Sequence, residues 1–103
     1  MKLDPRLGFH PEAVAEARGA ARWYRERNPD AAEAFLTEFD RALLRIAEAP
    51  ERWPVVEAGW RRFVLRRFPF SIVYRVQSGQ VEVLALAHGR RRPGYWRDRQ
   101  PRR

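Results

Sequence analysis

The chain of 103 residues contains no cysteine and only two histidines, His10 and His88, which stand far apart in the sequence. The absence of cysteine excludes disulfide bridges, thiol nucleophiles and zinc sites built on sulfur. Two distant histidines do not form a metal-ligand cluster, so the sequence predicts no metal site and no cofactor. The longest apolar runs fall far short of the roughly 20 residues that a membrane-spanning helix requires. Because the start of the chain also lacks the pattern of a secretory signal, we expect a soluble, cytoplasmic protein with no membrane partner.

Acidic side chains are scarce in the second half of the chain. Residues 1–59 hold nine Lys and Arg and eleven Asp and Glu, whereas residues 60–103 hold twelve basic and two acidic side chains. The two parts therefore carry about −2 and +10 of the formal net charge of +8. This segregation predicts that the C-terminal part attracts a polyanion or an acidic protein. The alternative, that the arginines only solubilise the surface, explains the total charge better than its segregation.

The first half of the chain predicts a short strand and two helices. Residues 6–10 read as the strand, and Pro11 is typical of the first position of a helix. Up to about residue 27, apolar residues recur at helical spacing on one face; they are Val14, Ala17, Ala21 and Tyr24. The Asn28-Pro29 pair ends this helix and caps a second one, whose apolar positions repeat until Pro50. Helices joined so tightly predict an antiparallel hairpin.

The second half of the chain predicts strands after a loop at residues 50–59. Residues 60–67, 70–76 and 81–87 read as three strands, and the last is apolar on both faces and therefore central. On the middle strand one face is expected to carry Phe70, Ile72, Tyr74 and Val76. The resulting order β-α-α-β-β-β predicts an α+β fold, with the helical hairpin packed on a small, mainly antiparallel sheet.

The length predicts a single domain, which we place at residues 1–98. Residues 99–103 form a basic C-terminal tail, and we expect the chain to fray from Arg97 onward because no aliphatic or aromatic side chain follows.

Polar and aromatic side chains gather after the last predicted strand. A histidine side chain can accept or donate a proton near neutral pH, so His88 is a candidate proton donor or acceptor, with Arg92 and Tyr95 completing a candidate catalytic set. Candidate groups for binding a phosphate or a partner's carboxylates are Arg62, Arg66, Arg90 and Arg91. Trp96 is a candidate for stacking on a base, as is Tyr95.

Each candidate also has a structural interpretation. His88 would fix a turn through a backbone hydrogen bond, the arginines would be solvated charges, and Tyr95 and Trp96 would fold back onto the core. Alternation along residues 60–67 places Arg62 and Arg66 on one face of the strand and the neighbouring arginines on the other.

Two stretches of this sequence resemble a known family. The first is Phe68-Pro69-Phe70-x-Ile72-x-Tyr74-x-Val76, and the second is Val81-x-Val83-Leu84-Ala85-x-x-His88-x-x-Arg91-x-Pro93-x-Tyr95-Trp96. Together they resemble the C-terminal half of the RelE/ParE superfamily, the toxins of type II toxin-antitoxin (plasmid stabilisation) systems. Asn28-Pro29-x-Ala31-Ala32-x-x-Phe35 fits the same family, so the resemblance covers about residues 6–98 and implies the same fold.

The resemblance implies one of two activities. Members that cleave mRNA on the ribosome use a basic cluster with a terminal tyrosine or histidine. Here Ser71 stands where an arginine is frequent, and Val64 stands where the second residue of a basic pair is frequent. Arg62 fits the first position of that pair. Because basic residues are missing at these two positions, the resemblance favours the ParE branch, whose members block DNA gyrase, over the RelE-like endoribonuclease.

Two alternatives to a gyrase-blocking toxin stay open. As an mRNA endonuclease acting on the ribosome, the protein would use His88 and Arg92, with Tyr95 or Trp96 in the terminal aromatic position. A chain that has lost its toxicity and only binds its partner is a third alternative. In every case we expect an acidic antitoxin that folds on binding across the helical hairpin and the basic sheet.

Overall fold

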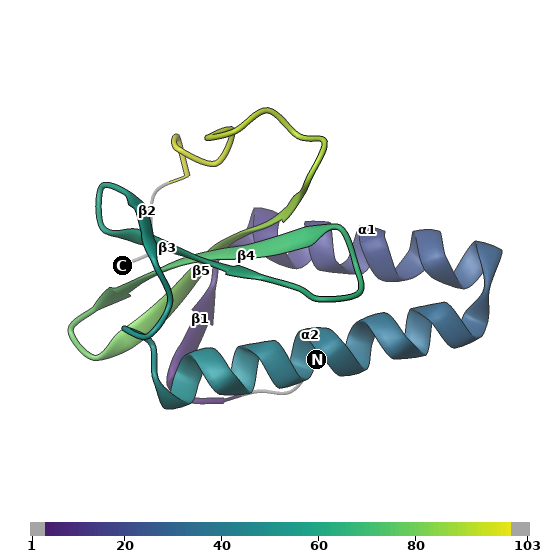
Figure 1. Ribbon diagram of the computed structural model, residues 1–103, viewed down its shortest axis with the longest axis horizontal. Coiled ribbons are helices and arrows are strands. Elements are labelled where there is room, and N and C mark those ends of the chain that lie inside the picture. Colours follow the sequence, from purple (N-terminus) through teal and green to yellow (C-terminus); the bar gives the residue numbers. More distant parts are fainter. Residues whose placement is uncertain (1–3, 100–103) are drawn as a thin grey trace.

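The computed structural model describes residues 4–99, which form two helices and one sheet of five strands (Figure 1). In chain order the elements are β1 (Leu7–Phe9), α1 (Pro11–Arg27), α2 (Pro29–Glu48), β2 (Val55–Glu57), β3 (Trp60–Val64), β4 (Phe70–Gln77) and β5 (Gln80–His88). The strand order is β1-β5-β4-β3-β2; β1 runs parallel to β5, and the other neighbours are antiparallel. The predicted α+β fold and helical hairpin are confirmed.

Asn28 separates the two helices and serves both of them. Its backbone N–H donates to the Tyr24 carbonyl and so ends α1, while its side-chain oxygen accepts the Asp30 N–H and so caps α2. Pro29 occupies the first turn of α2, where a missing N–H costs no hydrogen bond. The hairpin therefore follows from local chemistry, as the sequence predicted.

Apolar side chains fill the space between the helices and one face of the sheet. On α2 the largest of them, Phe35, Phe39 and Ile46, are at most 1% exposed. The predicted face of β4 is confirmed, because Phe70, Ile72, Tyr74 and Val76 all belong to this core. On α1 the prediction was only partly right. The buried residues of α1 are Ala13, Ala17, Ala20 and Ala21, whereas Val14 and Tyr24 are half-buried.

The chain after β5 covers the opposite face of the sheet. Figure 1 shows the helices on one side of the sheet and this segment, drawn in yellow, on the other. Trp60 and Trp96 pack there with Val73 and Leu84 in a second buried cluster. The central strands β4 and β5 are thus buried on both faces, and β5 lies between β1 and β4, as its apolar sequence predicted.

The region predicted as a loop contains a strand. β2 is three residues long and pairs with β3 through a turn in which Ala58 (φ 50°) and Gly59 (φ 81°) are left-handed. Ser78 and Gly79 form the predicted turn between β4 and β5. Both have a positive φ angle, as the favoured two-residue hairpin loop requires. The strand was missed because three residues that follow Pro54 directly carry too little periodic signal.

β3 is shorter than predicted. It ends at Val64 rather than at residue 67, and the chain then bends so that the Leu65 N–H donates to the Phe70 carbonyl. The predicted alternation of four arginines along one strand is therefore wrong, because Arg66 and Arg67 lie in this bend.

Candidate functional site

His88 ends β5 and stabilises the turn that follows. Its Nδ1 accepts the Arg90 backbone N–H at 3.0 Å, so the neutral ring carries its proton on Nε2. The ring packs edge-on against Phe70, its cross-strand neighbour, with the ring centroids 5.0 Å apart. These contacts match the structural interpretation of His88, and they hold the ring in one orientation.

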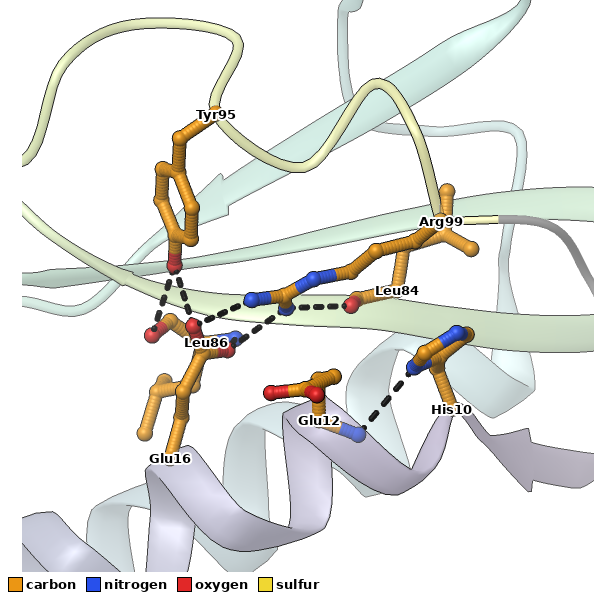
Figure 2. Close-up of polar contacts among 7 residues, drawn as sticks. All are labelled: His10, Glu12, Glu16, Leu84, Leu86, Tyr95 and Arg99. Atoms are coloured by element: carbon orange, nitrogen blue, oxygen red, sulfur yellow. Dashed lines mark hydrogen bonds and ion pairs between the residues drawn. The ribbon is translucent and has the colours of Figure 1, made fainter.

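Tyr95 is held by a carboxylate on α1 (Figure 2). Its hydroxyl donates to Glu16 Oε2 at 2.7 Å. Burial, followed by this hydrogen bond, raises the pKa of Tyr95 above its ordinary value. The phenol is therefore a neutral donor at physiological pH, and its proton is committed to Glu16.

Arg99 completes the same network. Its guanidinium donates to both oxygens of Glu16, at 2.9 and 2.8 Å, and also to the Leu84 carbonyl at 2.9 Å (Figure 2). The hydrogen bonds to Glu16 raise the pKa of Arg99. The Leu86 backbone N–H donates to the same carboxylate. Glu16 thus joins α1, β5 and the C-terminal segment, and neither Glu16 nor Arg99 was among the predicted site residues.

The C-terminal segment makes contacts that the sequence did not predict. Gly94 has φ 80°, which reverses the chain before Tyr95. Arg97 then pairs with Glu57 of β2, with Nη2 and Oε1 2.8 Å apart. Arg97 and Arg99, in the segment expected to fray, thus make hydrogen bonds with Glu57 and Glu16. Residues 100–103 of the predicted tail lie outside the described residues.

Trp96 belongs to the core rather than to the surface. It is 5% exposed, and its ring centroid lies 6.4 Å from that of Trp60. The ring has no face available for a base in this conformation. The capping interpretation of Trp96 fits the structure, and the predicted stacking role does not.

The predicted arginines occupy three different places. Arg91 lies over the Tyr95 ring, with its guanidinium carbon 3.8 Å from the ring centroid. Arg90 and Arg92 are exposed in the turn after β5, and Arg62 is exposed on β3. Arg66 is exposed in the bend after β3. The predicted binding residues therefore do not converge on one point.

Glu38 of α2 holds the bend after β3. Its carboxylate accepts the backbone N–H groups of Arg66 and Arg67, and it pairs with the Arg67 guanidinium at 3.3 Å. Partial burial opposes ionisation of Glu38, but these hydrogen bonds outweigh it and lower the pKa of the carboxyl. The positions of Arg66 and Arg67 are thus set by their backbone contacts with a helix.

A mostly apolar groove of about 410 Å³ lies between α1 and the end of the sheet. It brings together two of the three candidate catalytic residues, His88 and Tyr95, with Arg91, whereas Arg92 does not line it. The other lining residues are Glu16, Gly19, Ala20, Trp23, Tyr24, Pro69, Phe70 and Leu86. Trp23 is 51% exposed at this groove.

Residues 4–99 contain neither a helix that could cross a membrane nor a cluster of metal-ligating side chains. No helix in this range is long and apolar enough to span a membrane. No group of three or more metal-ligating side chains within the same residues could hold a metal ion.

Comparison with known proteins identifies the family. A family model described as the ParE toxin of the type II toxin-antitoxin system parDE matches residues 7–93. Toxin ParE2 of Mycobacterium tuberculosis, from two strains, is 27% identical over 92 residues, which are 88% of this chain and 88% of that protein. A structure of the chromosomal ParDE TA system from P. aeruginosa has a similar fold, with a TM-score of 0.70 at 20% identity over 80% of this chain and 92% of that chain. The chain belongs to the ParE toxin family of type II toxin-antitoxin systems.

Proposed function

We propose that this protein is a cytoplasmic toxin that arrests growth by binding and poisoning DNA gyrase, and that an acidic antitoxin neutralises it. The family model describes a toxin of a type II system, and the solved relative comes from a ParDE system. Gyrase as the target follows from the ParE branch that the sequence resembles.

We prefer a gyrase-binding toxin to an mRNA endonuclease because existing hydrogen bonds already occupy two of the candidate catalytic groups. The Tyr95 hydroxyl donates to Glu16, and His88 Nδ1 accepts the Arg90 N–H. Arg92 lies outside the groove that His88 and Tyr95 line. A general acid and base need geometry that reaches one reacting group, so the position of Arg92 outside this groove supports a non-enzymatic toxin.

Exposed positive charge supports a protein partner of opposite sign. Arg62, Arg90 and Arg92 are exposed, and residues 60–103 hold twelve basic against two acidic side chains. Such a surface accelerates association with an acidic partner at low ionic strength.

The test is inducible expression of the unaltered chain and of the His88→Ala and Arg92→Ala variants, with pulse labelling of protein and DNA synthesis. We expect DNA synthesis to fail first in all three cultures. The purified chain should inhibit supercoiling by purified gyrase. Early arrest of translation that either substitution relieves would overturn the proposal and favour an endoribonuclease.

A further inference from the structure

One edge of the sheet is open at the end of β3. β2 pairs with β3 at Trp60 and Arg61, and the Pro54 carbonyl accepts the Arg62 N–H. The β3–β4 hairpin continues past this point (Figure 1), and within residues 4–99 no further strand lies beside it. Val64, the last residue of β3, therefore lies on an uncovered edge.

The backbone of Val64 points outward from this edge. Facing residues of an antiparallel pair alternate between hydrogen-bonded and non-hydrogen-bonded pairs. The Leu65 N–H donates to the Phe70 carbonyl, so the adjacent pair of Val64 and Ser71 is a non-hydrogen-bonded one. The N–H and C=O of Val64 thus face away from β4, and neither has a backbone partner within residues 4–99. An extended chain laid along the edge would pair with both groups.

The side chain of Val64 is unusually open for an apolar residue. It is 62% exposed, more than any other large hydrophobic side chain within residues 4–99. Its neighbours Phe63 and Leu65 are 6% and 3% exposed and belong to the core beneath the helices. Their burial fixes the backbone of the strand, so Val64 is presented on a rigid support.

Arginines flank this edge on both sides. Arg62 stands two positions before Val64, about 7 Å along the strand, and Arg66 stands two positions after it in the bend. Both are exposed, and neither forms an ion pair within residues 4–99. No Asp or Glu occurs in the sequence between Glu57 and Glu82. The edge thus combines an apolar centre with positive charge on each side.

We propose that this edge is the docking site for the target of the toxin, an extended segment of DNA gyrase that adds to the sheet beside Val64 and places carboxylates against Arg62 and Arg66. Strand addition takes its affinity from main-chain hydrogen bonds and its specificity from the side chains that alternate along the strand. The inference rests on the proposed function and names the surface that performs it.

Two other occupants fit this edge less well. A second copy that paired antiparallel about Val64 would bring Arg62 of one copy against Arg66 of the other, and like charges directly opposite each other destabilise a sheet. A nucleic acid matches the charge but has no peptide groups to pair with the Val64 N–H and C=O. An acidic protein strand satisfies both requirements. The antitoxin is the other acidic protein, and binding measurements distinguish it from gyrase.

The test measures binding of the full chain to purified gyrase and its inhibition of supercoiling. Val64→Glu should weaken gyrase binding about 10-fold, because a charged side chain blocks strand addition at an edge and repels the carboxylates of the partner. Val55→Glu is the matched control, since Val55 is also an exposed strand valine but lies on β2. We expect that variant to bind and inhibit like the unaltered chain.

Charge reversal tests the two flanks of the edge. Arg62→Glu and Arg66→Glu should each weaken gyrase binding about 10-fold at low salt. Arg22→Glu, at an exposed position on α1, should weaken it much less. All three variants change the net charge equally, so a general loss of attraction does not explain a difference between them. Circular dichroism establishes that each variant is folded, and the exposed arginines keep the test valid even if Val64→Glu does not fold.

Amide hydrogen exchange distinguishes strand addition from a contact made by side chains alone. The Val64 N–H should exchange about 10-fold more slowly in the gyrase complex than in the free chain, because pairing with an added strand protects it. An unchanged exchange rate of this amide in the complex would overturn strand addition.

The outcomes separate this inference from the proposed function. Failure of the unaltered chain to bind gyrase would overturn the proposed function, and the inference with it. If the unaltered chain binds gyrase, equal binding by Val64→Glu and Val55→Glu, or by the Arg62→Glu, Arg66→Glu and Arg22→Glu variants, would overturn the edge alone. The same holds if the edge substitutions release the antitoxin, a second copy or a DNA duplex but leave gyrase inhibition intact.

Discussion

Glu16 and Arg99 stand 83 residues apart in the sequence and form a bidentate ion pair, with N–O distances of 2.9 and 2.8 Å. Their side chains are 17% and 12% exposed. The pair ties the C-terminal segment to α1, and the same carboxylate holds the Tyr95 hydroxyl. An acidic residue of the first helix therefore helps to hold the cover on the second face of the sheet, together with the buried Trp96 and the Arg97–Glu57 ion pair.

We expect Glu16→Gln to lower the free energy of unfolding by about 3 kcal/mol, because it leaves the largely buried Arg99 without its counter-charge. Urea denaturation measures the change. Glu33→Gln, at an exposed position on α2, is the matched control and should change stability by less than about 0.5 kcal/mol. Equal stability of the two variants would show that the ion pair does not hold the segment.

Tyr74 makes the protein sensitive to alkaline pH. Burial raises the pKa of Tyr74 from 10.0 to about 12, and the hydroxyl donates to the Pro50 carbonyl at 2.6 Å. Because the folded-state pKa is the higher one, this contribution to stability is fully present below pH 10 and is lost as the pH rises toward 12. Denaturation curves between pH 8 and 12 should show this loss, and Tyr74→Phe should reduce its slope. A slope unchanged by that substitution would contradict the assignment.

Trp96 anchors the C-terminal segment in the core. We expect Trp96→Ala to cost about 3 to 5 kcal/mol of unfolding free energy, as large core truncations do. Trp96→Phe should cost far less, because the indole Nε1 is buried and has no hydrogen-bond partner within residues 4–99. Thermal unfolding compares the two variants.

The Trp23→Ala variant tests whether an exposed tryptophan contributes to stability as the buried Trp96 does. Trp23 is 51% exposed, so its loss should alter the free energy of unfolding by less than about 0.5 kcal/mol in urea denaturation. A large loss of stability in Trp23→Ala would assign this ring to the fold rather than to a partner.

Glu38 should control the order of the bend after β3. Glu38→Gln removes the negative charge that accepts the Arg66 and Arg67 N–H groups. We expect amide hydrogen exchange at these two residues to accelerate about tenfold, the loss of roughly 1.4 kcal/mol of local stability. The lowered pKa of Glu38 also means that its contribution is present above the ordinary carboxyl pKa and is lost as the pH falls through the folded-state value. Exchange that stays unchanged at neutral pH in the variant would contradict this role.

Much of the fold was predictable because its signals are local. The Asn28-Pro29 pair acts through its own backbone neighbours, and the apolar repeat of α2 runs from Ala32 to Ala47. Ser78 and Gly79 form a turn that only a few residue pairs adopt readily. β2 and the early end of β3 were missed, since a short edge strand and a bend depend on pairing partners that local patterns do not reveal.

The candidate site was predicted less well than the fold. The order of residues after β5 correctly indicated that His88, Arg91 and Tyr95 lie near one another, since a rigid strand precedes them. Nothing in the sequence identified Glu16 as their partner, because a glutamate on an amphipathic helix is usually solvated. Arg99 looked like part of a charged tail for the same reason.

The sequence by itself determined the helical hairpin, the central apolar strand, the segregation of charge and the resemblance to a toxin family. These properties depend on neighbouring residues and on their spacing along the chain. Only the tertiary structure decided that Trp96 is buried, that Trp23 is exposed beside a groove, and that Glu16 meets Arg99. Burial and pairing of residues far apart in the sequence depend on how the chain folds back on itself, and local composition does not specify that geometry.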